Sequence, residues 1–258
     1  MKATRLLSLA IVVVAIVGSA IAQTANNILN ENEREALAAN ERGVEHLKSS
    51  RNKEAAEAFA LAIKLNPGFA VAYNNLGATF NSLGRFEEAI KVLKRALQLA
   101  PNYADAHYDL GVTLQSLGRS REAIDAYERA IRLKPDFTQA YSRLGGVYHD
   151  LGQREKAIEF YRAAIELDPK YARAYNNLGV AQAETGHYKD ATQNFERAIN
   201  LEPDFAIAQY NLGVVSLQAK DRTVALRQHA RLALLSSTLA AKLYAGIYRG
   251  RVLMLVTK

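Results

Sequence analysis

Proline recurs at a fixed interval along the 258-residue sequence. Consecutive prolines lie 34 residues apart, and the five of them are Pro67, Pro101, Pro135, Pro169 and Pro203. A fixed period of this length is the signature of a stacked repeat array, in which each unit buries its apolar face against its neighbours. The sequence therefore predicts one structural unit used repeatedly.

Glycine and alanine keep the same period as proline. Counted from a repeat start at Ala36, the eighth position is glycine in every unit: Gly43, Gly77, Gly111, Gly145, Gly179 and Gly213. The twentieth position is always alanine: Ala55, Ala89, Ala123, Ala157, Ala191 and Ala225. Small residues at fixed places indicate close approach of two helices. The array then divides into units 36–69, 70–103, 104–137, 138–171, 172–205 and 206–239.

Each unit is predicted to be a helical hairpin, because apolar residues recur at three- and four-residue steps in two runs separated by a turn. In the fourth unit we expect a first helix, A, near Gln139–Asp150 and a second helix, B, near Glu155–Leu167, with a break at Gly152. Gly145 and Ala157 would lie where these helices approach each other. Replacing Gly145 with Leu should therefore overpack the interface.

The residues of a unit also resemble a known family. The tetratricopeptide repeat (TPR) pattern of an aromatic residue, Leu-Gly, an aromatic residue, Ala, an aromatic residue, Ala and Pro is matched by Tyr141, Leu144, Gly145, Tyr148, Ala157, Tyr161, Ala164 and Pro169. The resemblance spans about 200 residues. It implies an all-α fold, a right-handed superhelical α-α solenoid of about six TPR helix-turn-helix units plus a C-terminal capping helix. It also implies that the array binds a protein or peptide.

The two ends of the array depart from the pattern. A polar lead-in over residues 23–35 precedes a first unit that has Arg42 where leucine is usual, which suits an N-terminal cap. The sixth unit has Lys220 in place of the turn glycine and His229 in place of an aromatic residue. Residues 240–258 are expected to complete a basic capping helix and tail, with Ser236 or Ser237 as the N-cap of that helix.

The final segment, RVLMLVTK, is apolar and rich in β-branched residues. It could add to a partner or pack back on the cap, and packing back is the interpretation we favour.

The N-terminal residues 1–22 have the layout of a cleavable signal peptide. Lys2 and Arg5 precede an apolar run from Leu6 to Val17, and cleavage is expected between Ala22 and Gln23. The alternative is an uncleaved anchor, but the run is shorter than the ~20 residues that span a bilayer. We therefore expect an exported protein, periplasmic or extracellular, which would be membrane-associated if the segment is retained.

Catalytic and cofactor chemistry is not indicated. The sequence has no cysteine, and its five histidines occupy unrelated repeat positions without a second ligand three or four residues away. Paired carboxylates such as Glu87 and Glu88 are followed by lysines and are typical of helix-surface charge pairing. The glycines serve helix crossings and turns rather than a phosphate loop. We predict no enzyme activity, no cofactor and no metal.

A candidate binding surface follows from the resemblance, which implies that A helices line a concave groove with their fifth and sixth positions directed into it. Asparagine recurs at the sixth position, and its amide can both donate to and accept from a peptide backbone. Tyrosine at two fifth positions could anchor a partner or pack against a neighbouring repeat. The candidate groove residues are Asn75, Tyr108, Asp109, Arg143, Asn177, Tyr210 and Asn211.

Capture of a C-terminal carboxylate by this groove is poorly supported. The family's clamp uses lysines at second positions, which are absent here, and only Arg173, Asn177 and Asn211 approach that set.

The leading functional prediction is an exported scaffold or adaptor that binds a protein or peptide in its groove and supports assembly of a complex. An alternative is a peripheral membrane-surface protein. The segment after position 219 is strongly basic, since Asp221 is its only acidic residue, and it could contact anionic lipid weakly. A third is a non-catalytic subunit of an envelope enzyme.

Loss of Lys2 and Arg5 lowers the formal net charge from +7 to +5, too small a surplus to indicate nucleic acid. We expect a monomer or small homo-oligomer.

Overall fold

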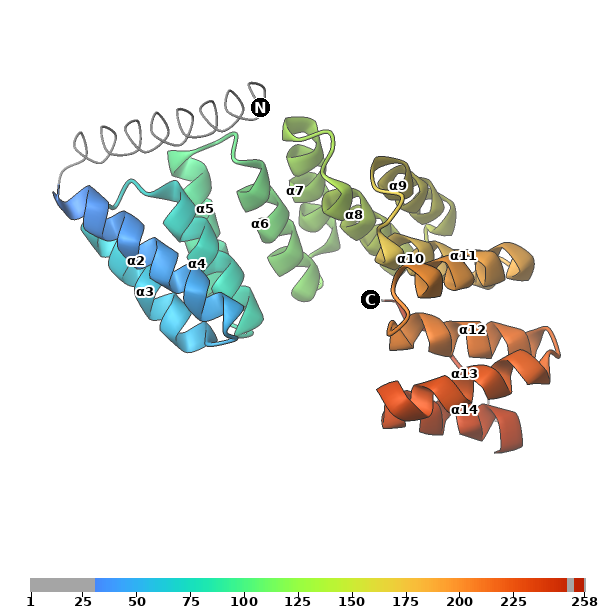
Figure 1. Ribbon diagram of the computed structural model, residues 1–258. Helices are drawn as coiled ribbons and strands as arrows, with labels where there is room; N and C mark the ends of the chain where they lie inside the picture. Colours follow the sequence, from blue (N-terminus) through green and yellow to red (C-terminus); the bar gives the residue numbers. More distant parts are fainter. Residues whose placement is uncertain (1–30, 250–252, 258) are drawn as a thin grey trace, which may run out of the picture. The chain divides into compact units, whose positions relative to one another are not determined.

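The computed structural model describes residues 31–249 and 253–257, and every regular element in this part of the chain is an α-helix (Figure 1). The predicted signal peptide, its cleavage point at Ala22 and Gln23, and the first part of the lead-in lie outside the described residues. None of the described helices has the length and hydropathy needed to cross a membrane.

The chain forms two compact units, which meet in the sequence between Pro101 and Asn102. The helices of the first unit are α2 (Glu31–Lys48), α3 (Asn52–Leu65), α4 (Ala70–Ser82) and α5 (Phe86–Leu99). Those of the second unit are α6 (Ala104–Ser116), α7 (Ser120–Leu133), α8 (Thr138–Asp150), α9 (Arg154–Leu167), α10 (Ala172–Glu184), α11 (Tyr188–Leu201), α12 (Ala206–Gln218), α13 (Arg222–Leu235) and α14 (Ser237–Arg249).

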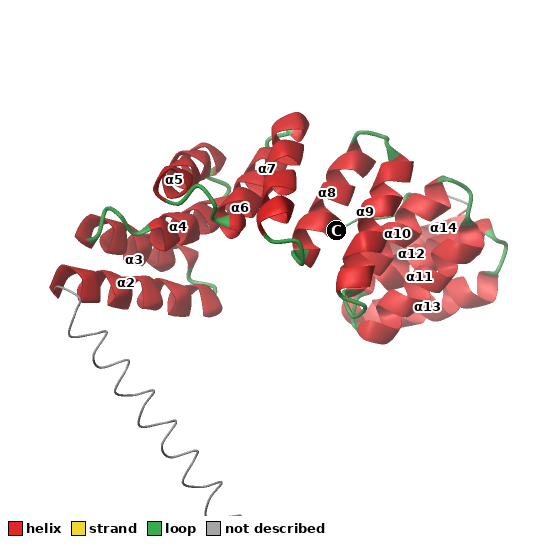
Figure 2. Cartoon of the chain, turned by 90° about the horizontal axis from the view of Figure 1, so that it is seen from above, coloured by secondary structure: helices red, strands yellow, loops and turns green. Residues whose placement is uncertain are grey.

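Successive helices pair as hairpins, joined by short loops (Figure 2). The A helices carry the even labels α2 to α12, and the B helices carry the odd labels α3 to α13. The helices expected in the fourth unit are confirmed, since α8 and α9 start one residue before the predicted positions and end where predicted. Helix α2, in contrast, already contains residues 31–35, so that the end of the predicted polar lead-in is helical.

The glycine at the eighth repeat position lies under a large side chain of the paired helix. A Cβ atom built on Gly145 would be 2.8 Å from Cε1 of Tyr161 and 3.2 Å from the carbonyl oxygen of Ala157. Tyr161 is fully buried. Gly179 has the same relation to Phe195, at 2.8 Å. In these two repeats the glycine is therefore required by the ring that covers it, and in the second repeat Leu93 covers Gly77 in the same way.

Each A helix ends in a left-handed residue that turns the chain into the B helix. Glycine supplies it in the four middle repeats, for example Gly152 with φ of 74°. Ser50 and Lys220 take this conformation in the first and last repeats, with φ of 57° and 62°. The closing hydrogen bond of the turn is kept, since the amide of Asp221 donates to the carbonyl oxygen of Ser216 at 2.8 Å.

Helix α14 completes the sixth repeat as well as capping the array. Leu243 of α14, fully buried, covers Gly213, where the other repeats use a residue of their own B helix. His229 instead lies beside the ring of Tyr244, with centroids 5.7 Å apart. The predicted N-cap is confirmed, because the amide of Leu239 donates to Oγ of Ser236 at 3.4 Å.

Candidate functional site

The A helices of neighbouring repeats contact one another and form one continuous face in each unit. These contacts join α2 to α4 in the first unit, and α6 to α8, α8 to α10 and α10 to α12 in the second. We call this surface the A-helix face. Side chains at the fifth and sixth repeat positions meet on it.

Asparagine side chains link adjacent A helices at a constant sequence separation. Nδ2 of Asn75 donates to Oδ1 of Asn40 at 2.9 Å, and Nδ2 of Asn211 donates to Oδ1 of Asn176 at 2.9 Å. In both pairs a sixth-position residue bonds to the fifth-position residue of the preceding repeat. Because asparagine is a mediocre helix former, these bonds are one reason for its use here.

The C-terminal segment 253–257, called the tail below, lies across α10 and α12 (Figure 1). Asn211 binds the backbone of Val256 through both ends of its amide. Its Nδ2 donates to the carbonyl oxygen of Val256 at 2.6 Å, and its Oδ1 accepts from the amide of Val256 at 2.8 Å. Asn176 donates to the same carbonyl oxygen at 3.4 Å. Two buried asparagines thus hold one residue of non-helical backbone.

A pocket of about 260 Å³ adjoins the end of the tail. Its walls are formed by residues of α6, α8, α9 and α10, by Tyr171 and by Thr257 of the tail. The polar side chains among them are Gln115, Ser142, Arg143, His149, Asp150, Tyr161, Tyr171, Arg173, Asn177 and Thr257. Burial raises the pKa of the Tyr171 phenol, so it stays protonated and can donate a hydrogen bond. The pocket therefore offers mainly hydrogen-bond donors and positive charge.

Comparison with known proteins identifies the repeat. Family models described as tetratricopeptide repeat match residues 68–136 and 172–205, and one described as TPR repeat matches residues 145–186. A crystal structure of MamA is 32% identical, with 62% of this chain and 94% of that chain covered and a TM-score of 0.55. The chain belongs to the tetratricopeptide repeat family. The predicted family and the all-α TPR solenoid fold are confirmed.

Two further solved structures are similar over more of the chain. YrrB, described as a TPR protein with an unusual peptide-binding site, is 28% identical over 72% of this chain and 97% of its own, with a TM-score of 0.55. PilF of Pseudomonas aeruginosa shares the fold, at 18% identity, 84% and 99% coverage and a TM-score of 0.72. A search among curated proteins found no match.

The TPR array is a protein-interaction scaffold, a fold that is typically non-catalytic. Within residues 31–249 and 253–257, no three His, Asp or Glu side chains are grouped so that they could hold a metal ion.

The structure distributes the seven candidate groove residues unequally. Asn75 belongs to the first unit and the other six to the second. Arg143 and Asn177 line the pocket, and Asn211 holds the tail. Asp109 is half-buried on α6, where its carbonyl oxygen accepts from Oγ1 of Thr113 at 2.8 Å.

The two tyrosines are packed within the chain rather than open to a partner. Tyr108 lies against the rings of Tyr127 and Phe137, with centroids 5.8 and 4.9 Å away. Tyr210 is only 2% exposed and belongs to an apolar cluster against which Leu253 and other tail residues pack. Both positions are therefore packed, Tyr108 against two rings of its own repeat and Tyr210 in a cluster of its own repeat, α14 and the tail.

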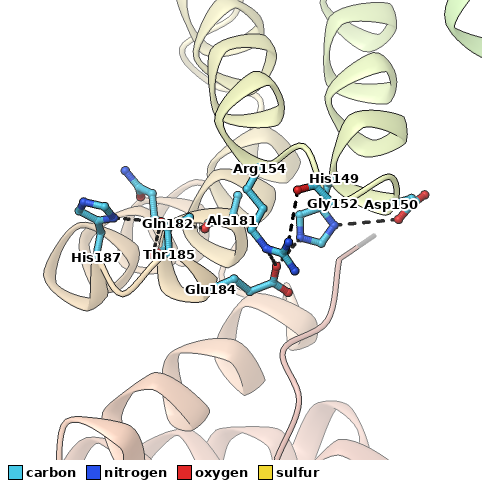
Figure 3. A network of polar contacts seen from close by, with 9 residues as sticks. All are labelled: His149, Asp150, Gly152, Arg154, Ala181, Gln182, Glu184, Thr185 and His187. Carbon is cyan, nitrogen blue, oxygen red and sulfur yellow. Dashed lines mark hydrogen bonds and ion pairs between the residues drawn. The ribbon is translucent and has the colours of Figure 1, made fainter.

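A charged network beside the pocket was missed by the sequence reasoning. Nε2 of His149 on α8 lies 3.0 Å from Oε2 of Glu184 on α10, and Nε of Arg154 donates to the same oxygen at 2.6 Å (Figure 3). The hydrogen bond with Asp150 and the charge of Glu184 raise the pKa of His149, and burial opposes them. His149 and Glu184 lie 35 residues apart, like the asparagine pairs, and this offset was the signal in the sequence.

Proposed function

We propose that this chain is an exported TPR scaffold that binds an extended peptide segment of a partner protein along its A-helix face and supports assembly of a complex. The observation that carries the proposal is the contact between Asn211 and Val256. A side-chain amide that pairs with both the N–H and the C=O of one residue recognises backbone in an extended form, whatever its side chain.

The depth of the site also supports a peptide ligand. Asn176 and Asn211 are both fully buried, and a buried amide left without partners costs free energy. Because a peptide backbone completes the hydrogen bonds of both amides, the site favours a bound peptide. The neighbouring structure of YrrB, described as having a peptide-binding site, is consistent with this use of the fold.

The test is capture of partners from an envelope extract on immobilised protein, quantified by mass spectrometry. Replacing both Arg143 and Asn177 with Ala removes two pocket side chains. We expect partners to be depleted about tenfold, the effect of losing ~1.4 kcal/mol of binding free energy. Asn200→Ala is the matched control, because Asn200 is exposed on the B helix α11. Equal partner sets from all three proteins would contradict the proposal.

Export is inferred from the N-terminal sequence. Fractionation of cells that produce the full chain, followed by N-terminal sequencing, should yield a mature protein that begins at Gln23. A protein that keeps Met1 in the soluble cytoplasmic fraction would refute this part.

The membrane-surface alternative receives less support from α14. Helices that lie on membranes insert an exposed apolar face. The apolar face of α14 is already covered, with Leu243 fully buried and Ala240 and Ile247 each 6% exposed. Sedimentation with anionic liposomes at low and high salt distinguishes the two functions, because only lipid binding through the basic residues would appear at low salt and disappear at high salt.

A further inference from the structure

The tail shows what kind of peptide the A-helix face accepts, since Leu253, Met254 and Leu255 alternate between contact and solvent, and Val256 packs against the same cluster as the two leucines. Leu253 and Leu255 are partly buried against the apolar cluster formed by α12, α13 and α14, and Leu255 also contacts the cluster formed by α10, α11 and α12. Met254, between them, is 81% exposed. This is the side-chain pattern of an extended chain laid on a surface.

The backbone and the last described residue add two more points of recognition. Val256 is held at both backbone polar groups by Asn211. Thr257 follows it and lines the polar pocket with Arg143 and Asn177. In Figure 3 the pale red trace of the tail rises from the lower helices toward His149 and Asp150, two further pocket residues.

We propose that the α10–α12 part of the A-helix face binds an extended segment of the type Leu-x-Leu-Val-Thr, and that in the free protein residues 253–257 occupy this site. This inference rests on the proposed peptide-binding function and names its ligand. A partner segment would have two apolar residues separated by one exposed residue. The backbone of the next residue would be bound by Asn211, and a small polar side chain would follow and enter the pocket. It would bind by displacing the tail.

Displacement is feasible because the tail is short and tethered. A segment linked through a few residues competes at an effective concentration on the order of 1 mM. If the tail itself binds the open site with a Kd of about 0.1 mM, a competing peptide is weakened about tenfold, from the ratio of the effective concentration to the Kd of the tail. The tail lowers the affinity for every competing segment by the same factor, without abolishing binding.

The experiment measures binding of a fluorescent, N-acetylated and C-amidated peptide, RVLMLVTK, by fluorescence polarisation. The proteins are the full chain and a chain that ends at Arg249. We expect the shortened chain to bind the peptide about tenfold more tightly than the full chain. Adding Asn211→Ala to the shortened chain should weaken binding about tenfold again, because the backbone clamp is lost. Far-ultraviolet circular dichroism and the melting temperature establish that each protein is folded.

Two peptides test the alternation directly. Replacing both leucines that correspond to Leu253 and Leu255 with Asp should abolish binding to the shortened chain. Replacing the residue that corresponds to Met254 with Asp should leave the Kd within about twofold, because that side chain faces solvent.

A point variant tests the position of the first leucine. A Cβ on Gly246 of α14 would collide with Cδ1 of Leu253 and would lie 3.2 Å from Cδ1 of Leu217 on α12. Gly246→Ala in the shortened chain should therefore weaken binding of the peptide, whose first leucine takes the place of Leu253. Lys242→Ala, on the exposed side of the same helix, should leave the affinity unchanged.

The proposal is overturned if the folded, shortened chain does not bind the peptide, or if it binds no better than the full chain does. It is also overturned if light scattering shows that the full chain is a dimer that becomes monomeric on loss of the tail, because the tail then occupies a second copy. In each case the proposed function would still be supported if the variant of Arg143 and Asn177 captured fewer partners than the wild type. The proposed function and the proposed ligand can therefore fail separately.

Discussion

Gly145 and Gly146 are adjacent on α8 and should respond oppositely to the same substitution. At Gly145 a new Cβ would be 2.8 Å from Cε1 of Tyr161 and 3.2 Å from the carbonyl oxygen of Ala157. At Gly146 it would be 3.7 Å from Nε2 of Gln115 and 3.9 Å from Oη of Tyr161, which are ordinary van der Waals distances.

The magnitude follows from two opposing terms. Alanine gains about 1 kcal/mol over glycine in a helix interior, and this gain applies at both positions. Overpacking costs about 1–3 kcal/mol, and it applies only at Gly145, where a new Cβ would collide with the fully buried ring of Tyr161. The free energies of unfolding of the two variants should therefore differ by about 1–3 kcal/mol, with Gly146→Ala above the wild type.

Urea denaturation followed by far-ultraviolet circular dichroism measures both variants under one set of conditions. A common slope with different midpoints would assign the difference to stability. If Gly145→Ala proved as stable as Gly146→Ala, the close packing of A on B helices would not be the reason for glycine at the eighth repeat position.

Three further predictions concern the ends of the array and the charged network. Lys220→Gly should raise the free energy of unfolding by about 1 kcal/mol in urea denaturation, because it relieves a positive φ of 62° while keeping the turn. Leu243→Ala should lower it by about 2–5 kcal/mol, since the side chain is fully buried, while Leu234→Ala at an 89% exposed position of α13 should change it by less than about 0.5 kcal/mol. His149→Gln should lower the melting temperature more at about pH 5.5 than at about pH 8.5. The folded pKa of His149 is raised by its hydrogen bond with Asp150 and the charge of Glu184, so its stabilisation is complete below the unfolded value and is lost as pH rises through the folded one.

The repeat architecture could be predicted from sequence because its packing residues are local and periodic. Gly145 determines the close crossing of the two helices, Gly152 the turn between them and Pro169 the end of the second helix. The predicted bounds of these helices accordingly agree with the structure to within one residue. The chemistry of the sixth position was also visible, since an asparagine offers the same donors and acceptor wherever it stands.

Exposure of the candidate site could not be predicted in the same way. Tyr210 has the sequence context of an open fifth position, but it lies in a cluster that is completed by residues of α14 and the tail, which belong to no repeat. Asn211 is likewise fully buried because Val256 lies on it. A pattern confined to single repeats contains no information about a segment that returns from outside the array.

The sixth repeat did carry a signal that could have located α14. Gly213 is kept although the residue that should cover it is His229, a polar side chain that suits a buried apolar contact poorly. A glycine of this kind without a large apolar partner in its own hairpin indicates that another element supplies one. Leu243 is that partner, and the spacing of α14 after α13 brings it there.

Helix α14 thereby joins the stability of the array to access to the A-helix face, but through different residues. Leu243 covers Gly213 and completes the last repeat, while Gly246, almost one turn further on, lies beneath Leu253 of the tail. Because the two contacts are made by different residues, removal of Leu253 from α14 leaves the contact between Leu243 and Gly213 intact. We therefore expect that the tail can leave the site without unfolding the sixth repeat. A peptide that replaces it needs to match only the interactions of Leu253, Leu255, Val256 and Thr257, and not the packing that holds the solenoid together.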